Sequence, residues 1–316
     1  MASRRPKFQT AYYAASGHSA NDCLFLGQRF PENEDFSPNH GESWVLAAEP
    51  DGEDDATIRL IQGSPRRLNG IWRSPTGRAI VVDHTGHARN AGPFVPGVPF
   101  TWEEHDLQTS LLGVWGIDDR FALAWGMRRL HDWTMHRWDG TRWNAVESPD
   151  FFVHAVHGSS PEDVWAVGWD GRTARWDGHH WRPFSTPVRE ALVSVYVESD
   201  DEMYAVGIDG SLLEGSSHGW ALVGRGPGPL GLHAVAKWRG ELWIGAGAGG
   251  LCRRVGTTSE IEVVKPNVWA MSFDARWDLV IVTQSEIVGT ADGSSFIGFG
   301  LDSLAELRAG AGLMEW

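Results

Sequence analysis

Two observations predict an all-β fold, a seven-bladed β-propeller built from four-stranded antiparallel blades. A unit of about 40 residues recurs along the chain, and each copy contains four short apolar segments separated by turn residues. The clearest copy spans residues 153–181, and residues 192–220 align with it at a shift of 39 without a gap. Seven copies fill the 316 residues, so we expect one propeller domain over 1–316.

Each strand of the clearest copy follows from its local sequence. The apolar segment at 154–156 predicts the first strand, and DVWAVG at 163–168 predicts the second after a turn of Ser, Pro and Asp. RTARW at 172–176 predicts the third strand. The fourth begins at Trp181, after an Asp-Gly pair that suits a tight hairpin. The second strands are largely apolar, as expected for strands buried between neighbouring sheets.

The other copies repeat these landmarks. Blades are expected near residues 10–46, 66–102, 111–147, 152–185, 191–224, 231–265 and 267–300. Tryptophans recur at two places, the start of the fourth strand (Trp44, Trp143, Trp181 and Trp220) and the second strand (Trp165 and Trp243). Because they follow the repeat, we predict that most of the 18 tryptophans pack between blades.

The landmark residues resemble those of a known class of repeat protein. They are Gly158, Asp163, Val164, Trp165, Gly168, Gly171, Trp176, Asp177, Gly178 and Trp181. This pattern resembles the bacterial WD40/YVTN/BNR-like β-propeller repeats over about residues 10–300. The resemblance implies the fold, but such propellers range from scaffolds to hydrolases. The Asp-box of sialidase-like propellers has one incomplete counterpart, at 290–296, which argues against sialidase chemistry.

The C-terminal segment departs from the strand pattern. Ser303 and Glu306 form a capping box and Gly310 suits a helix stop, so we predict a short C-terminal helix at 303–309. One chain terminus is expected to complete a blade, because an open sheet edge invites pairing with other chains. The sequence does not indicate which terminus does so.

Charge and composition exclude several classes of function. The chain has 27 basic and 41 acidic residues, a net charge of −14, which disfavours binding to nucleic acid. No apolar run is long enough to span a membrane, and no apolar signal core follows the basic start. We therefore expect a cytoplasmic protein. Cys23 and Cys252 are expected to be two buried thiols in a reducing compartment.

Candidate binding residues lie on the loops of one face. In such propellers, the turns between second and third strands share this top face with the connections between blades. Two of these turns are longer than a blade requires. The first, 28–40, contributes Glu32, Glu34 and Asp35, and the second, 127–137, contributes Arg128, Arg129, His131, Trp133 and His136. Basic groups beside an aromatic ring suit a carboxylate, a phosphate or a protein partner. The alternative is a solvated loop whose tryptophan packs on the next blade.

Three further candidates are Trp169, in a neighbouring turn, and Trp102 and Glu103, which we place in a connection between blades. The acidic segment at 49–55 is also expected to connect blades. It is either a solvated turn or a docking patch that steers a basic partner.

The sequence offers no catalytic or metal-binding motif. It contains no GxSxG elbow, no phosphate-binding loop and no dinucleotide fingerprint. The glycine-rich segment at 245–250 falls at a strand–turn position. The histidine pairs 84/87 and 131/136 lie on different blades, and each pair supplies only two of the three or four protein ligands that a zinc site needs. We expect no catalytic residue, metal or cofactor.

These observations predict a non-enzymatic protein-interaction scaffold or adaptor, monomeric on its own, that binds a protein partner on its loop face. Three alternatives remain open. The net charge also suits an inhibitor or immunity protein that neutralises a basic partner such as a toxin. A propeller hydrolase or lyase would need carboxylates or histidines in the central channel, and a lectin would need repeated exposed aromatic platforms.

Overall fold

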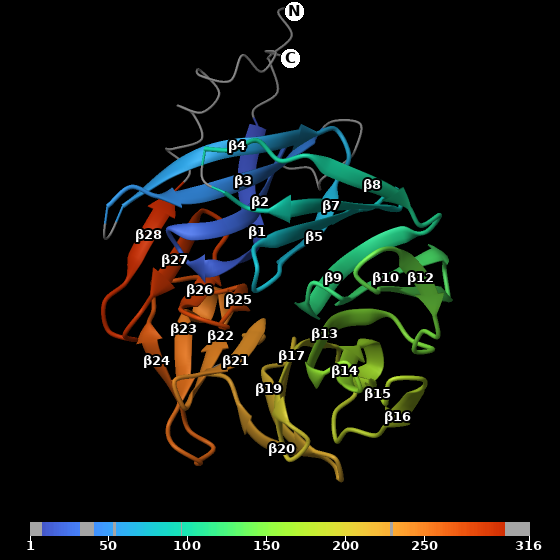
Figure 1. Cartoon of the computed structure of the whole chain (residues 1–316). Coiled ribbons are helices and arrows are strands. Elements are labelled where there is room, and N and C mark those ends of the chain that lie inside the picture. Colours follow the sequence, from blue (N-terminus) through green and yellow to red (C-terminus); the bar gives the residue numbers. More distant parts are fainter. Residues whose placement is uncertain (1–7, 32–40, 53–54, 96, 228–229, 301–316) are drawn as a thin grey trace, which may run out of the picture.

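The computed structural model describes residues 8–31, 41–52, 55–95, 97–227 and 230–300. These residues form seven four-stranded antiparallel sheets arranged in a ring (Figure 1). The sheets follow one another around the ring in chain order, so the predicted seven-bladed propeller is confirmed. Among the described residues, no helix has the length and apolarity needed to cross a bilayer.

Every blade consists of four consecutive strands, numbered along the chain. Blade 1 contains β1 (Phe8–Ser19), β2 (Asp22–Pro31), β3 (Glu42–Pro50) and β4 (Ala56–Ser64), and blade 2 contains β5 (Leu68–Arg73), β6 (Arg78–Asp83), β7 (His87–Pro93) and β8 (Trp102–Asp106). Blade 3 contains β9 (Ser110–Asp118), β10 (Phe121–Arg129), β11 (Asp132–Trp138) and β12 (Trp143–Val146). Blade 4 contains β13 (Val153–Ser160), β14 (Asp163–Gly168), β15 (Thr173–Trp176) and β16 (Trp181–Phe184).

The remaining blades repeat this arrangement. Blade 5 contains β17 (Leu192–Ser199), β18 (Glu202–Gly207), β19 (Ser211–Ser216) and β20 (Gly219–Arg225), and blade 6 contains β21 (Ala234–Trp238), β22 (Glu241–Gly245), β23 (Leu251–Arg254) and β24 (Ile261–Lys265). Blade 7 contains β25 (Ser272–Asp274), β26 (Leu279–Val282), β27 (Glu286–Thr290) and β28 (Ile297–Gly300). Two 3₁₀ turns, η1 (Trp169–Gly171) and η2 (Gly247–Gly249), follow β14 and β22.

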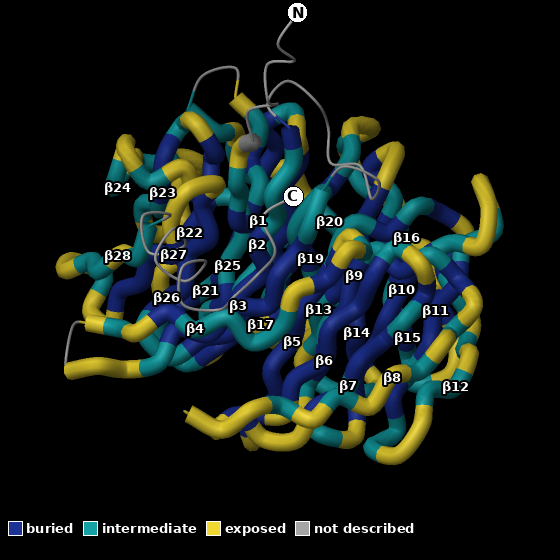
Figure 2. The backbone as a smooth tube through the Cα atoms, turned by 90° about the horizontal axis from the view of Figure 1, so that it is seen from above, coloured by how far each residue is buried: buried dark blue, intermediate teal, exposed yellow. Residues whose placement is uncertain are grey.

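The hydrophobic core lies between adjacent blades. All six residues of β14 are buried, because its sheet is covered on both faces, and this explains its continuous apolar sequence. Trp165 on β14 is fully buried and packs edge-on against Trp220 of blade 5, with ring centroids 5.5 Å apart. Trp243 is buried in the same way between blades 6 and 7. The predicted packing of these recurring tryptophans is confirmed, and Figure 2 shows the buried inner strands beneath exposed turns.

The ring closes differently from the prediction. Within the described residues every sheet is made of four consecutive strands, so no terminal strand is shared between the first and last blades. Blade 1 instead packs its side chains against blade 7, with Phe25 in one core cluster with Val280. Two backbone hydrogen bonds join the same blades, from the Tyr12 amide to the Gln284 carbonyl and from the Asp278 amide to the His18 carbonyl, each 3.0 Å long. The expectation that one terminus completes a blade was wrong, because blade 1 obtains all four strands from local sequence.

Blades 1 and 2 extend further than the sequence indicated. Trp44 lies in the third strand, β3, where it pairs with Gly27 of β2 and Gly63 of β4, so its placement at the start of the fourth strand was wrong. The insertion after β2 shifted that alignment by one strand. The acidic segment 49–55 begins in β3 and precedes β4, so it falls within blade 1 and does not connect two blades. Residues 102–106 form β8 rather than a connection. The helix expected at 303–309 lies outside the described residues.

Candidate functional site

The turns of the propeller divide between two faces. The turns between second and third strands and the connections between blades form the top face, and the other turns form the bottom face. Among the described residues, nine large apolar side chains are exposed, and five of them lie on the top face. These five are Leu130, Trp169, Ile208, Leu230 and Trp269. Because exposed apolar side chains grouped on one face mark interaction sites, the top face is the candidate binding surface.

Blade 3 projects a β-hairpin from the top face. The long turn predicted at 127–137 is instead an extension of β10 and β11, whose pairing continues to Arg129 and Asp132. Leu130 and His131 form the tip, where Leu130 is 68% exposed. His131 has a φ of 64°, a left-handed conformation that side chains other than glycine adopt at a cost of about 1–3 kcal/mol. An exposed leucine beside a strained residue serves no packing purpose, so the tip is a candidate contact point.

An aromatic cluster lies beside this hairpin. The Trp133 ring meets the Phe152 ring edge-on at 5.5 Å, and Phe152 stacks on Trp169 at 4.6 Å. The ring centroids of His131 and Trp133 are 5.9 Å apart, and those of His154 and Phe152 are 4.9 Å apart. The structure thus brings together three predicted residues, His131, Trp133 and Trp169. We define the blade 3–4 site as Leu130, His131, Trp133, Phe152, His154 and Trp169.

Sequence reasoning missed Phe152 and His154. Phe152 belongs to the connection between blades 3 and 4, and His154 follows it on β13. Neither stands at a landmark position of the repeat. The adjacent pair Phe151-Phe152 was the available signal, since two aromatic residues exceed what one connection requires.

Two arginines flank the blade 3–4 site. The side chains of Arg128 and Arg129 are 54% and 85% exposed, and their closest carboxylate is that of Asp132, at 4.0 and 3.7 Å. Contacts of this length on the surface contribute little to stability. Both guanidinium groups are therefore exposed and only weakly paired.

His136 occupies a different position from the one predicted. It lies within β11 and is buried, so its assignment to an exposed loop was wrong. Strand alternation places it on the face of the sheet that Thr134 shares, opposite Trp133. The Thr134 hydroxyl forms a hydrogen bond with that of Thr109, in the connection between blades 2 and 3. Burial, together with the charge of Arg128, lowers the pKa of His136. His136 therefore belongs to the wall between blades 2 and 3.

The other predicted residues do not join the site. Trp102 and Glu103 lie on β8, the outer strand of blade 2, because the blade is longer than expected. Trp102 stacks on Phe100 at 5.0 Å, and Glu103 lies 3.6 Å from His105. Their placement in a connection was wrong. Glu32, Glu34 and Asp35 lie outside the described residues.

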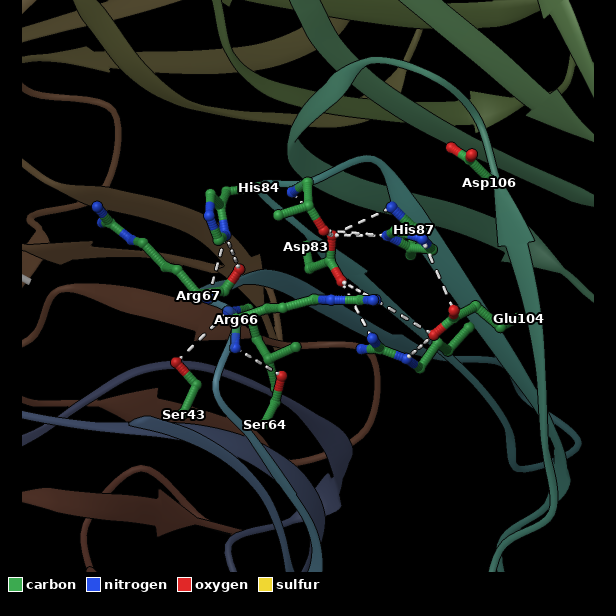
Figure 3. A network of polar contacts seen from close by, with 12 residues as sticks. Ser43, Ser64, Arg66, Arg67, Asp83, His84, His87, Glu104 and Asp106 are labelled. Carbon is green, nitrogen blue, oxygen red and sulfur yellow. Dashed lines mark hydrogen bonds and ion pairs between the residues drawn. The ribbon is translucent and has the colours of Figure 1, made fainter. Parts of the chain in front are cut away.

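A polar network fixes the top face at blade 2 (Figure 3). Asp83 is fully buried and accepts hydrogen bonds from the amides of Thr85 and His87. Arg89 links it to Glu104, with contacts of 3.1 and 2.7 Å. Burial would raise the pKa of Asp83, but the hydrogen bonds and the charge of Arg89 outweigh it and lower that pKa. The charges of Asp83, Arg89 and Glu104 are paired with one another, so this network stabilises a turn and offers no unpaired charge to a ligand.

The first strands of all seven blades line a central cavity of about 410 Å³. Three histidines face it, His154 and His233 toward the top and His157 toward the bottom. The Nδ1 atom of His157 accepts a hydrogen bond from the Val197 amide at 3.0 Å, so in the neutral ring Nε2 carries the proton. Burial and the charge of Arg276 lower the pKa of His157 to about 4. In the described chain, no three side chains of metal-binding type lie close enough to hold an ion.

An ion pair between the buried Asp274 and the more exposed Arg276 lies where the ring closes. Arg276 donates to both oxygens of Asp274, to the Ser16 hydroxyl at 2.7 Å and to the Arg73 carbonyl at 2.6 Å. These partners belong to blades 7, 1 and 2. Burial would raise the pKa of Asp274, but the charge and hydrogen bonds of Arg276 lower it. The pair is satisfied by the fold and joins three blades.

No family model matches the chain. The chain is 28% identical over 135 residues to the immune protein Tsi7 of Pseudomonas aeruginosa, a match that covers 40% of this chain and 43% of that protein. The chain thus spans less than half of the curated relative.

Solved structures resemble the whole ring. YCF48 bound to D1 peptide has a TM-score of 0.63 at 14% identity, covering 89% of this chain and 95% of that one. The WD40 propeller domain of Doa1 has a TM-score of 0.65 at 10% identity, covering 91% and 92%. At this identity the likeness shows the fold alone, and the chain shares the β-propeller architecture of WD40-type proteins.

Proposed function

We propose that this protein is a non-enzymatic interaction module that binds a protein partner through the blade 3–4 site on its top face. The observation that carries the proposal is the aromatic cluster of Trp133, Phe152 and Trp169 beside the exposed tip at Leu130. Tryptophan and arginine dominate the binding energy of protein interfaces.

The conformation of the turns supports the same location. Four residues other than glycine have a left-handed φ in the described chain, and three lie on top-face loops, two of them within or beside the blade 3–4 site. These three are Gln108, His131 and Asp170. Such conformations cluster at functional sites because the surrounding structure must hold them at an energetic cost. The β-hairpin and η1 therefore present a rigid surface, which lowers the entropic cost of binding.

The test is a quantitative pull-down from the native host with matched variants. The site variant combines Leu130→Ser, Trp133→Ala and Trp169→Ala. The control combines Leu222→Ser and Val263→Ala, exposed apolar residues on the outer strands β20 and β24. We expect one stoichiometric partner on the wild type and the control, and its loss from the site variant. Equal recovery on all three, with unchanged melting temperatures, would remove the blade 3–4 site as the binding surface.

A second candidate function is an immunity protein that neutralises a toxin. It is favoured by the similarity to an immune protein and by the net charge of −14. Here the partner would be the product of a neighbouring toxin gene. Co-expression of that toxin with this chain should restore cell growth, and the site variant should fail to do so at equal protein level. Growth arrest despite a full level of wild-type chain would reject this candidate.

A further inference from the structure

A second group of exposed apolar side chains lies on the top face, across blades 5 to 7. Ile208, Leu230 and Trp269 are 49%, 40% and 51% exposed. Ile208 follows β18, Leu230 lies in the connection to blade 6, and Trp269 lies in the connection to blade 7. None of the three stands at a landmark of the repeat, and no requirement of the blade explains their exposure.

Backbone contacts join these three residues into one surface. Ile208 lies beside Leu230, because a Cβ on Gly231 would meet the Ile208 carbonyl at 2.6 Å, and the glycine-rich segment links Leu230 to Trp269. A turn at 246–250 connects β22 to β23 and bears no side chain larger than a methyl group. Its Gly247 amide donates to the Ala270 carbonyl, next to Trp269, and a Cβ on Gly249 would meet Leu230 at 3.3 Å. The turn therefore lies between Leu230 and Trp269. Ala248 is exposed and Gly249 is half-buried, so the outer side of this turn presents no bulky side chain to an extended segment lying across it.

The parts of this surface around Leu230, the glycine-rich turn and Trp269 carry no charged side chain, in contrast to the protein as a whole. Residues 230–233, 246–250 and 266–271 include no Asp, Glu, Lys or Arg. Burial lowers the pKa of His233, the one titratable group among them, so its ring is neutral near pH 7. Nearby, Asp209 is paired with Arg225 at 3.0 Å. The acidic residues gather on bottom-face turns instead, for example at Asp118-Asp119 and Asp200-Asp201.

We infer that Ile208, Leu230, Trp269 and the turn at 246–250 form a second contact surface, the blade 5–7 patch, which binds an extended, uncharged protein segment with apolar side chains. The charge distribution selects this occupant, because a basic segment would be drawn to the acidic bottom face. The inference rests on the proposed function in that both surfaces contact the same partner. They lie on the same face around the central channel, so the partner spans the channel mouth.

The size of a stable interface supports two contact surfaces. A specific complex buries about 800 Å² on each partner, contributed by about 20–30 residues. The tip of one hairpin with its aromatic neighbours contains far fewer. A partner that reaches from blade 3 to blade 7 would contact both groups of exposed side chains and so more of the top face.

The test uses a phage-displayed library of random peptides of about twelve residues, selected on the full-length protein. We expect enrichment of uncharged peptides rich in aliphatic and aromatic residues. For a synthetic enriched peptide, Trp269→Ala should raise Kd by roughly tenfold or more, as expected for a tryptophan anchor. Raising NaCl from about 0.05 to 0.5 M should change Kd by less than about twofold, because screening acts on charged contacts. Hydrogen exchange should slow at 208–210 and 246–250.

Controls separate this surface from the blade 3–4 site. Val263→Ala, on an outer strand, and the triple variant at Leu130, Trp133 and Trp169 should both bind the peptide with wild-type Kd. Enrichment of basic, salt-sensitive peptides, an unchanged Kd in Trp269→Ala, or no enrichment above uncoated beads would each overturn the inference. None of these outcomes affects the pull-down, which depends on the blade 3–4 site. Conversely, partner recovery on all pull-down variants would reject that site while leaving peptide binding by the blade 5–7 patch measurable.

Discussion

The ring of Trp169 stacks on the ring of Phe152, with centroids 4.6 Å apart and planes inclined by 14°. Phe152 belongs to the connection between blades 3 and 4 and Trp169 to a turn of blade 4. A hydrogen bond of 3.1 Å from the Trp169 amide to the Phe152 carbonyl holds these two loops together. Gly168 makes this approach possible, because a Cβ at that position would collide with the same carbonyl. A landmark glycine of the repeat therefore positions the central pair of the blade 3–4 site.

Replacement of this glycine should disturb the site as well as the fold. Gly168→Ala must displace the Phe152 backbone, so we expect a loss of about 2 kcal/mol or more in the free energy of unfolding. Urea titration followed by tryptophan fluorescence measures it. Gly92→Ala is the matched control, since Gly92 lies in a strand with open space around its Cα. Equal stability of the two variants would contradict this account of Gly168.

The buried tryptophans of the second strands should carry much of the packing energy. Trp165 is fully buried between blades 4 and 5, so Trp165→Ala should lower the free energy of unfolding by about 3–5 kcal/mol. Trp269→Ala removes the same side chain from an exposed position and should cost less than about 0.5 kcal/mol. Chemical denaturation of both variants checks the difference, and similar losses would show that burial between blades does not determine the effect.

Ring closure should depend on the pair of Asp274 and Arg276. Arg276→Met leaves a buried carboxylate without its counter-ion, and we expect a cost of about 3 kcal/mol. Adding Asp274→Asn removes the unpaired charge and should recover part of that loss. Denaturation of the two single variants and the double variant gives the coupling energy. Additive losses would mean that the two side chains act independently.

The pH dependence of stability should reflect His157. Its pKa of about 4 in the folded protein lies below the unfolded value of about 6.5, so the unfolded chain binds the proton first as the pH falls. The contribution is therefore complete above pH 6.5 and is lost between pH 6.5 and 4, by roughly 3 kcal/mol.

His157→Gln should flatten the curve of unfolding free energy over this range of pH. Glutamine can still accept the hydrogen bond of the Val197 amide, which keeps the wall of the channel intact. His179→Gln, in an exposed turn of blade 4, is the control and should leave the curve unchanged. Identical pH profiles for His157→Gln and the wild type would contradict this assignment.

Much of the architecture was predictable because a blade is a local structure. The strands of blades 4 and 5 followed from a gap-free repeat. In it the turn residues recur, and Trp165 and Trp181 align with Tyr204 and Trp220. Prediction failed where an insertion broke this register, as at Trp44, which belongs to the third strand. Once one strand is displaced, every later element of the blade is displaced with it.

The candidate site was only partly predictable. The unusual length of the blade 3 loop pointed to Trp133 and His131, and both lie at the site. Phe152 was missed because its role depends on a contact with another loop. His136 was misplaced because it is part of a strand and not of a loop. In a strand, residues two positions apart share a face, so His136 lies on the face opposite Trp133, and the bounds of β11 were needed to apply that rule.

The sequence by itself determined the number of blades, the order of their strands and the burial of the repeated tryptophans. These features depend on turn chemistry and apolar pattern within about 40 residues. The tertiary structure decided how the ring closes, through Arg276 and side-chain packing, and which exposed side chains gather on one face. Those outcomes depend on contacts between blades, and residues that meet across blades follow no spacing that a single sequence records.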